Sequence, residues 1–80
     1  PREVAVGNDA AELVGRSIQG LPFLQKEALI LREYEKFDYQ EIAEVLHKPQ
    51  GTIKTLIHRA RENLKNKLLP YIEELQGGTP

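Results

Sequence analysis

The 80-residue sequence predicts an all-α fold: a four-helix domain that contains a helix-turn-helix. Apolar residues recur at helical spacing in four segments, and glycine or proline separates these segments. Residues 38–68 predict a short capped helix, a tight turn and a longer helix whose outward face is basic. The second helix of such a motif can lie in the major groove of DNA. The residues alone therefore favour DNA recognition.

Length and composition exclude several classes of protein. Eighty residues suffice for one domain with a small core, since folding at this size buries about 60–65% of the unfolded surface. The chain has no Cys, so it can form neither a disulfide nor a thiolate metal site. No apolar run reaches the roughly 18 residues of a membrane span, and no signal-peptide pattern opens the chain. Because the chain starts at Pro1 and has no Met, we expect a piece of a larger protein.

The net charge of −1 conceals an uneven distribution. Residues 1–46 carry five Lys and Arg against nine Asp and Glu, whereas residues 47–67 carry six Lys and Arg against Glu62 alone. The net charges are −4 and +5 for these segments and −2 for the remainder. The basic segment indicates a contact surface, and the acidic remainder could face a different partner. A solvated basic helix face without a ligand is the alternative.

The first two helices are predicted from capping and apolar patterns. Residues 1–8 have no periodicity and are expected to be a linker remnant. Asp9, with Glu12 three residues later, resembles a capping box and predicts a helix over 9–19. The second helix is expected over 22–35, and its many apolar residues imply burial on more than one side.

Three signals place the start of the third helix, which is expected over 39–47. Asp38 is the predicted N-cap, with Glu41 at the reciprocal position of a capping box. Phe37 before the cap and Ile42 inside the helix have the spacing of a hydrophobic staple. The apolar stripe of this helix is predicted to consist of Ile42, Val45 and Leu46.

The fourth helix is expected over 50–68, with Pro70 ending or sharply kinking it. Residues 71–75 could add a short turn, so one domain is predicted over 9–75, followed by a flexible tail at 76–80. The predicted buried face consists of Ile53, Ile57, Ala60, Leu64 and Leu68. The predicted outward face consists of Gly51, Thr55, His58, Arg59 and Glu62, flanked by Lys54 and Arg61 on one side and by Thr52 and Leu56 on the other.

From Leu21 onward the sequence resembles region 4 of a bacterial RNA polymerase sigma factor of the sigma-70 family, most like the extracytoplasmic-function group. The strings that carry the resemblance are LP at 21–22, LRE at 31–33, YQEIAEVL at 39–46, GTIKT at 51–55 and HRAR at 58–61. It covers about 50 of the 80 residues. It implies a winged-helix-like domain without a β-wing that recognises the promoter −35 element in transcription initiation. The implied partners, in the bacterial cytoplasm, are promoter DNA, the flap of the polymerase β subunit and, because one commonly masks this surface in the family, an anti-sigma factor.

The resemblance also assigns expected contacts to particular residues. The recognition-helix contact positions fall on Lys54, Thr55, His58 and Arg59. The phosphate-contact positions fall on Arg32 and Thr52, with Pro49 and Gly51 at the turn that enters the recognition helix. Lys48 and Arg61 complete the predicted DNA-binding set. Two departures from the family pattern are Leu56, where the family often has Arg, and His47, where the turn usually has Gly.

Each candidate also has a purely structural explanation. Arg59 and Lys54 could contact a base edge or a phosphate, since Arg fits guanine in a bidentate manner, or they could be solvated surface charges. Arg61 could instead pair with an acidic residue of another helix, and Arg32 with a nearby Glu. Leu56 is expected at the edge of the core, with exposure to a partner as the alternative.

The sequence contains no pattern for catalysis or for a cofactor. The Glu residues are spread over helix surfaces with no nucleophile beside them, so we do not expect an enzyme. His47 and His58 lack further ligands for a metal, and no phosphate-binding loop is present. Two alternatives remain: a helix-turn-helix regulator of LuxR type, which would often dimerise on DNA, and a protein-interaction module on the same scaffold.

Overall fold

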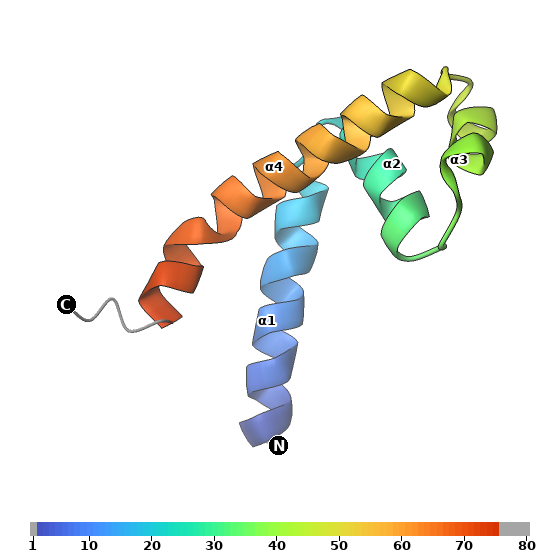
Figure 1. Cartoon of the computed structure of the whole chain (residues 1–80). Coiled ribbons are helices and arrows are strands. Elements are labelled where there is room, and N and C mark those ends of the chain that lie inside the picture. The colour runs from blue at the N-terminus through green and yellow to red at the C-terminus, as the bar shows by residue number, and fades with distance from the viewer. Residues whose placement is uncertain (1, 76–80) are drawn as a thin grey trace.

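The computed structural model describes the backbone of residues 2–75 and the side chains of residues 10–74. In this part of the chain it has four α-helices and no strand, which confirms the predicted all-α class. Figure 1 labels the helices. In chain order they are α1 (Arg2–Gln19), α2 (Phe23–Glu33), α3 (Tyr39–Leu46) and α4 (Gln50–Leu75).

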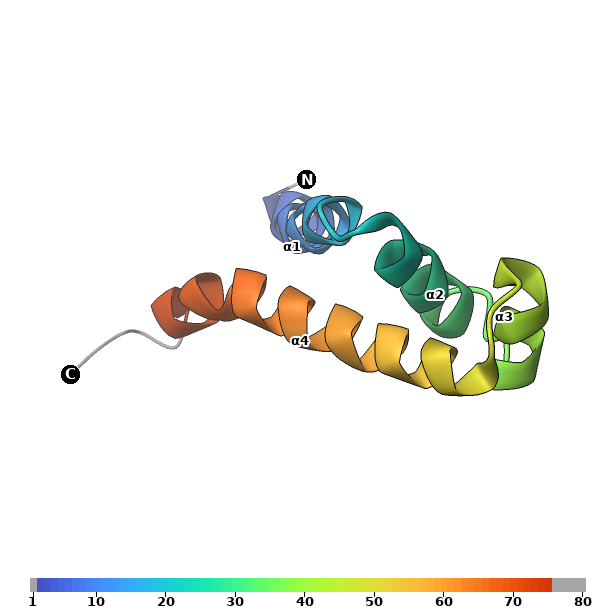
Figure 2. The same cartoon turned by 90° about the horizontal axis from the view of Figure 1, so that it is seen from above.

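Helix α4 is the element on which the other three helices pack. Figure 1 shows α3 at the beginning of α4, α2 beside its first half and α1 nearer its middle. Seen from above in Figure 2, α1, α2 and α3 all lie on one side of α4. The other side of α4 is left open, and α3 and α4 form the predicted helix-turn-helix.

A first hydrophobic cluster, here called the turn cluster, joins α2, α3 and α4. Its fully buried members, each with 0% exposure, are Ala28, Ile42, Ile53 and Ile57. Partly buried residues around them are Leu31, Phe37, Tyr39, Ala43, Leu46 and Leu56. Burial of an isoleucine side chain stabilises a fold by about 1.5–3 kcal/mol. The three isoleucines therefore fix the rotation of α3 and of the first turns of α4.

A second hydrophobic cluster, here called the α1 cluster, joins α1, α2 and α4. Its buried members are Ile18, Leu21, Leu29 and Ala60, with Val14, Ile30 and Leu64 packed against them. Ala28 and Leu29 are neighbours in the sequence, yet they belong to different clusters because successive residues of a helix point about 100° apart. Helix α2 is therefore buried on two sides, as its apolar composition predicts.

The predicted capping box at the start of α3 is present. The backbone N–H of Glu41 donates to the Asp38 carboxylate, and the backbone N–H of Asp38 donates to the Glu41 carboxylate, both at 2.8 Å. Phe37 and Ile42, the predicted staple, both belong to the turn cluster. The start of α3 is confirmed at Tyr39.

The turn between α3 and α4 depends on a left-handed residue. His47 adopts φ 58° and ψ 47°, the conformation that Gly favours. This allows the backbone N–H of Lys48 to donate to the carbonyl of Ala43 at 3.0 Å, which closes the end of α3. Helix α4 then begins at Gln50, directly after Pro49, as predicted.

The first helix is longer than predicted. It begins at Arg2 rather than at Asp9, so Asp9 lies inside the helix and does not cap it. The expected linker remnant at 1–8 is therefore helical from Arg2 on, and Pro1 lies outside the described residues. A glycine costs a helix only about 1 kcal/mol relative to Ala. Gly7 and Gly15 therefore lie inside α1 without ending it.

The predicted ends of α2 and α4 also need correction. Helix α4 continues through Pro70 to Leu75 instead of ending at residue 68. Proline removes one hydrogen bond and clashes with the preceding turn, and a bend can relieve this clash. Figure 1 shows α4 bending in its C-terminal third, as the kink alternative predicts. Helix α2 ends at Glu33 rather than at residue 35, and Lys36 beyond it adopts a left-handed φ of 62°.

Some residues that the apolar patterns include are exposed. Val45, expected in the buried stripe of α3, is 49% exposed, so this part of the prediction is wrong. Helix α3 packs on α2 and α4 through the face of Ile42, and Val45 lies beyond their reach. Phe23, the first residue of α2, is 66% exposed, and Tyr34, which directly follows this helix, is 61% exposed. Neither is needed to complete the two clusters.

Replacing His47 by glycine is expected to stabilise the domain. A residue with a Cβ atom is strained in the left-handed conformation, whereas glycine adopts it freely. The free energy of unfolding of His47→Gly, measured by denaturant titration, should rise by about 1 kcal/mol. The matched control is Glu44→Gly at an exposed position inside α3, which should lose about 1 kcal/mol. Equal losses for both variants would contradict a left-handed cap at His47.

Candidate nucleic-acid interface

The outward face of α4 lies opposite its buried isoleucines. Ile53, Ile57 and Ala60 are fully buried, and the helical period therefore turns the opposite residues to solvent. The predicted outward residues are all exposed: Gly51, Thr55, His58, Arg59 and Glu62. Lys48, Thr52, Lys54 and Arg61 are exposed as well. The structure thus gathers most of the predicted contact residues around the first three turns of α4.

The beginning of α4 has open space beside its backbone, so that a ligand can come close to it. A Cβ atom added at Gly51 would have no neighbour within 4 Å, so nothing in the domain itself requires glycine there. The hydroxyl of Thr55 donates to the carbonyl of Gly51 at 3.2 Å, and the side chain is exposed. The first turn of α4 has no acidic residue, so no carboxylate offsets the positive end of the helix dipole.

Lys54 lies on the flank of α4 beside α3. Its Nζ is 5.9 Å from the centre of the Tyr39 ring, within the range of a cation–π contact. The guanidinium carbon of Arg32 is 5.0 Å from the centre of the same ring. One aromatic ring of α3 thus lies beside a cation from α2 and a cation from α4.

Arg32 has a structural partner, but it is not a carboxylate. Its guanidinium donates to the backbone carbonyl of Phe37 at 3.0 Å and is half-buried. This bond ties the end of α2 to the loop that leads into α3. The structure therefore gives Arg32 an internal role, which is different from the Glu pairing considered from the sequence.

Arg61 forms an ion pair with Glu33 of α2. This is the structural alternative that the sequence left open. The hydrogen bond from Arg61 holds the pKa of the Glu33 carboxyl below its ordinary value of 4.5. Partial burial raises this pKa, but by less than the hydrogen bond lowers it. The positive charges of Arg61, Lys36 and Arg32 lower this pKa further. Arg61 is therefore engaged in the α2–α4 contact, although its side chain remains 52% exposed.

His58 and Arg59 form no ion pair with any other described side chain and are exposed on α4. Both line a shallow groove with Gln25, Glu62 and Asn63. The side-chain amide of Asn63 donates to Gln25 of α2 at 2.8 Å, a polar contact that could not be predicted from the sequence. His58 and Arg59 are thus available for an external ligand.

Leu56 is half-buried and packs against the turn cluster. This confirms its expected place at the edge of the core. An arginine at this position, as the family pattern often has, would have to leave that packing in order to reach solvent. The missing cation is therefore replaced by an apolar contact that stabilises the helix-turn-helix.

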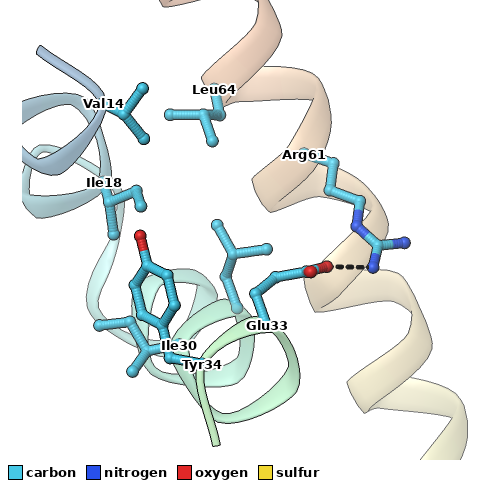
Figure 3. A pocket seen from close by; sticks show the side chains of 8 residues that line it. Val14, Ile18, Ile30, Glu33, Tyr34, Arg61 and Leu64 are labelled. Atoms are coloured by element: carbon cyan, nitrogen blue, oxygen red, sulfur yellow. Dashed lines mark hydrogen bonds and ion pairs between the residues drawn. The ribbon is translucent and has the colours of Figure 1, made fainter. Parts of the chain in front are cut away.

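A second concave surface lies away from the basic face, between α1, α2 and α4. Figure 3 shows Val14 and Leu64 on opposite walls of this apolar groove, which has a volume of about 260 Å³. The Glu33–Arg61 pair lies at its edge. Its apolar lining consists of Val14, Ile18, Leu29, Ile30, Tyr34 and Leu64.

Among the side chains described, those of residues 10–74, no cluster of three or more His, Cys, Asp or Glu has the arrangement to bind a metal ion. None of the four helices combines the length and the apolar character needed to span a membrane.

Comparison with known proteins identifies one family. The family described as sigma-70, region 4, matches residues 11–64. Proteins named ECF RNA polymerase sigma-E factor from Escherichia coli strain K12 and from Salmonella typhi are 36% identical to the chain over 72 residues. The protein of the same name from Haemophilus influenzae is 37% identical over 72 residues. In each case the match covers 90% of this chain and 38% of the relative, so the chain spans little more than a third of those proteins.

Removing the carboxylate of Glu33 should have a small, pH-dependent effect on stability. Because the folded pKa of this carboxyl is lowered, the pair contributes stability above the unfolded pKa and loses it as the pH falls through the folded pKa. Both side chains are exposed, so Glu33→Gln should cost less than about 1 kcal/mol near pH 7. Denaturant unfolding at a series of pH values tests this, with Glu35→Gln as the exposed control. A cost that stays constant into acid would contradict a role for the ion pair.

Proposed function

The chain belongs to the sigma-70 region 4 family, and on this basis we propose that it recognises the −35 element of bacterial promoters as the region 4 domain of a sigma factor. The observation that carries the proposal is the basic face at the start of α4, which the packing of α2 and α3 turns outward. The curated relatives are named RNA polymerase sigma factors, and the chain spans 38% of their length. Directing transcription initiation is therefore proposed for the whole protein of which this domain is a part.

In this function the first turns of α4 enter the major groove. Arg59 and His58 are exposed on α4 and would contact base edges, and the exposed Thr55 would contact a thymine methyl. Lys48, Thr52 and Lys54 are exposed around the start of α4, where they would contact phosphates. Gly51 allows the DNA backbone to come close, since no side chain intervenes.

The two remaining candidates have different roles in this proposal. Arg61 mainly stabilises the α2–α4 contact through Glu33, so we do not assign it a base contact. Arg32 uses one N–H group on Phe37 and keeps other donors, because a guanidinium has five. We retain Arg32 as a phosphate contact that also anchors the loop before α3.

The proposed partners besides promoter DNA are the RNA polymerase core, through the flap of its β subunit, and an anti-sigma factor, in the bacterial cytoplasm. The apolar groove of Figure 3 does not include the outward residues of α4. A protein bound in this groove would therefore leave the basic face free for DNA. No step of this function needs a cofactor or catalysis by the chain.

Binding of the isolated chain to duplex DNA should be weak and strongly dependent on salt. Only a handful of cations surround the start of α4, and each phosphate contact releases counterions. Fluorescence anisotropy with a −35-type duplex at increasing salt would measure this. An affinity that does not change with salt would favour the alternative of a protein-interaction module.

Two substitutions should separate base reading from phosphate contact. Arg59→Ala should weaken binding to the preferred duplex by about 1–3 kcal/mol and relax the preference at one base position. Lys54→Ala should weaken all sequences similarly and reduce the salt slope by about 1. Anisotropy titrations against a set of single-base variants of the duplex would distinguish the two effects.

The matched control is Lys65→Ala, which removes one exposed charge from α4 about three turns beyond Lys54. It should change binding less than Lys54→Ala does. Equal effects would mean that only total charge matters. Normal −35-dependent transcription by the double variant Lys54→Ala/Arg59→Ala would show that the recognition surface lies elsewhere.

Gly51→Ala should separate DNA binding from folding. The added methyl has open space in the free domain, and alanine favours a helix over glycine, so the melting temperature should stay the same or rise. In the complex the same methyl would meet the closely approaching DNA backbone, and affinity should fall. Thermal melting and anisotropy on the same variant measure both quantities. Gly15→Ala, another helical glycine with open space around it, is the control and should leave affinity unchanged.

A further inference from the structure

Tyr39 is the one residue that contacts cations from two other helices within the described side chains. It is the first residue of α3, and its ring is half-buried against the turn cluster. The guanidinium of Arg32 lies 5.0 Å from the ring centre, and the ammonium of Lys54 lies 5.9 Å from it. The ring thus connects α2 and α4 through side chains that have no carboxylate partner among the described residues.

The arrangement is physically unusual because two like charges share one ring, at 5.0 Å and 5.9 Å from its centre, and so lie at most about 11 Å apart. The face of an aromatic ring carries negative potential, which attracts a cation and partly offsets the repulsion between two of them. A lysine side chain otherwise has many rotamers, and no ion pair of the described residues fixes Lys54. The rotamer of Lys54 is therefore restrained by the ring, while Arg32 is fixed by both the ring and Phe37.

We propose that Tyr39 is a positioning residue for DNA binding, which holds Lys54 and Arg32 together beside the start of α4 as a pair of phosphate contacts. This proposal rests on the proposed function. A multiply charged backbone is the ligand that suits two unneutralised cations held on one ring, whereas a single carboxylate would leave one of them uncompensated. The ring lowers the entropic cost of binding because the cations are ordered before DNA arrives.

The contact itself can be tested without DNA, on the full 80-residue chain. In NMR spectra, the Hε resonances of Lys54 should be displaced by the ring current in the wild-type chain and in Tyr39→Phe. They should return toward the position of the urea-unfolded chain in Tyr39→Leu, which keeps an apolar side chain but removes the ring. The unfolded chain supplies a reference even where the Leu variant does not fold. Lys54 resonances at the unfolded position in the folded wild-type chain would overturn the proposal.

The effect on DNA can then be measured by a double-mutant cycle. Tyr39→Leu should weaken binding to a −35-type duplex about two- to fivefold, the range expected from an exposed cation–π contact. Tyr39→Phe should retain wild-type affinity. In the Lys54→Ala background, the same Tyr39→Leu change should cost clearly less, because one of its two partners is already absent. Tyr34→Leu is the matched control, since it removes an exposed tyrosine ring on the side of the apolar groove.

The outcomes separate the two proposals. If the losses of binding free energy caused by Tyr39→Leu and Lys54→Ala are fully additive, in a chain that binds DNA in a salt-dependent manner, the proposed role of Tyr39 is overturned. The proposed function of the domain is then unaffected. A purely structural role would lower the melting temperature and weaken binding equally in both backgrounds. A wild-type chain whose Lys54 resonances are displaced but which does not bind duplex DNA would overturn the proposed function. The proposal that Tyr39 positions two phosphate contacts would fall with it.

Discussion

The structure depends on one constraint: a single face of α4 has to pack against three other helices. Ala28 of α2 and Ala60 of α4 have 0% exposure, and such small side chains allow two helices to approach closely. Ala28 belongs to the turn cluster, where isoleucines fill the remaining space, and Ala60 belongs to the α1 cluster, where larger aliphatic side chains do so. Because this packing fixes the rotation of α4, it also decides which of its side chains face solvent. The candidate DNA surface is thus a consequence of how the core is filled.

The parts of the fold that depend on local chemistry could be predicted from the sequence. The start of α3 follows from Asp38 and Glu41, which bond each other's backbone whatever the rest of the chain does. The start of α1 and the end of α4 could not be predicted, because glycine and Pro70 weaken a helix without having to end it. The exposure of Val45 was missed because an apolar period does not show how many neighbours a short helix has.

The candidate site divides in the same way. The helical period of α4 was sufficient to predict that His58 and Arg59 face solvent. It offered an ion pair of Arg61 with another helix as one of two alternatives but could not name Glu33, and it did not indicate the bond of Arg32 to Phe37, because these contacts join residues of different helices or loops. Tyr39 was absent from the predicted site altogether. One feature of the sequence could have indicated it: Tyr39 is an aromatic residue at the predicted start of α3, between a helix that carries Arg32 and a helix that carries Lys54.

The internal contacts also limit what the basic face can do. With Arg61 neutralised by Glu33, and with Lys65 and Lys67 farther along α4, the cations near the turn are Lys48, Lys54, Arg59 and, from α2, Arg32. The electrostatic part of DNA affinity grows with the number of phosphates that are neutralised, each of which contributes about 0.9 to the slope of the logarithm of the binding constant against the logarithm of the salt concentration. A set of cations this small therefore cannot support strong binding through charge alone. In the proposed function, selectivity then has to come from the few side chains that reach base edges. Occupancy of the promoter has to come from the larger assembly, which raises the effective concentration of this domain at its site.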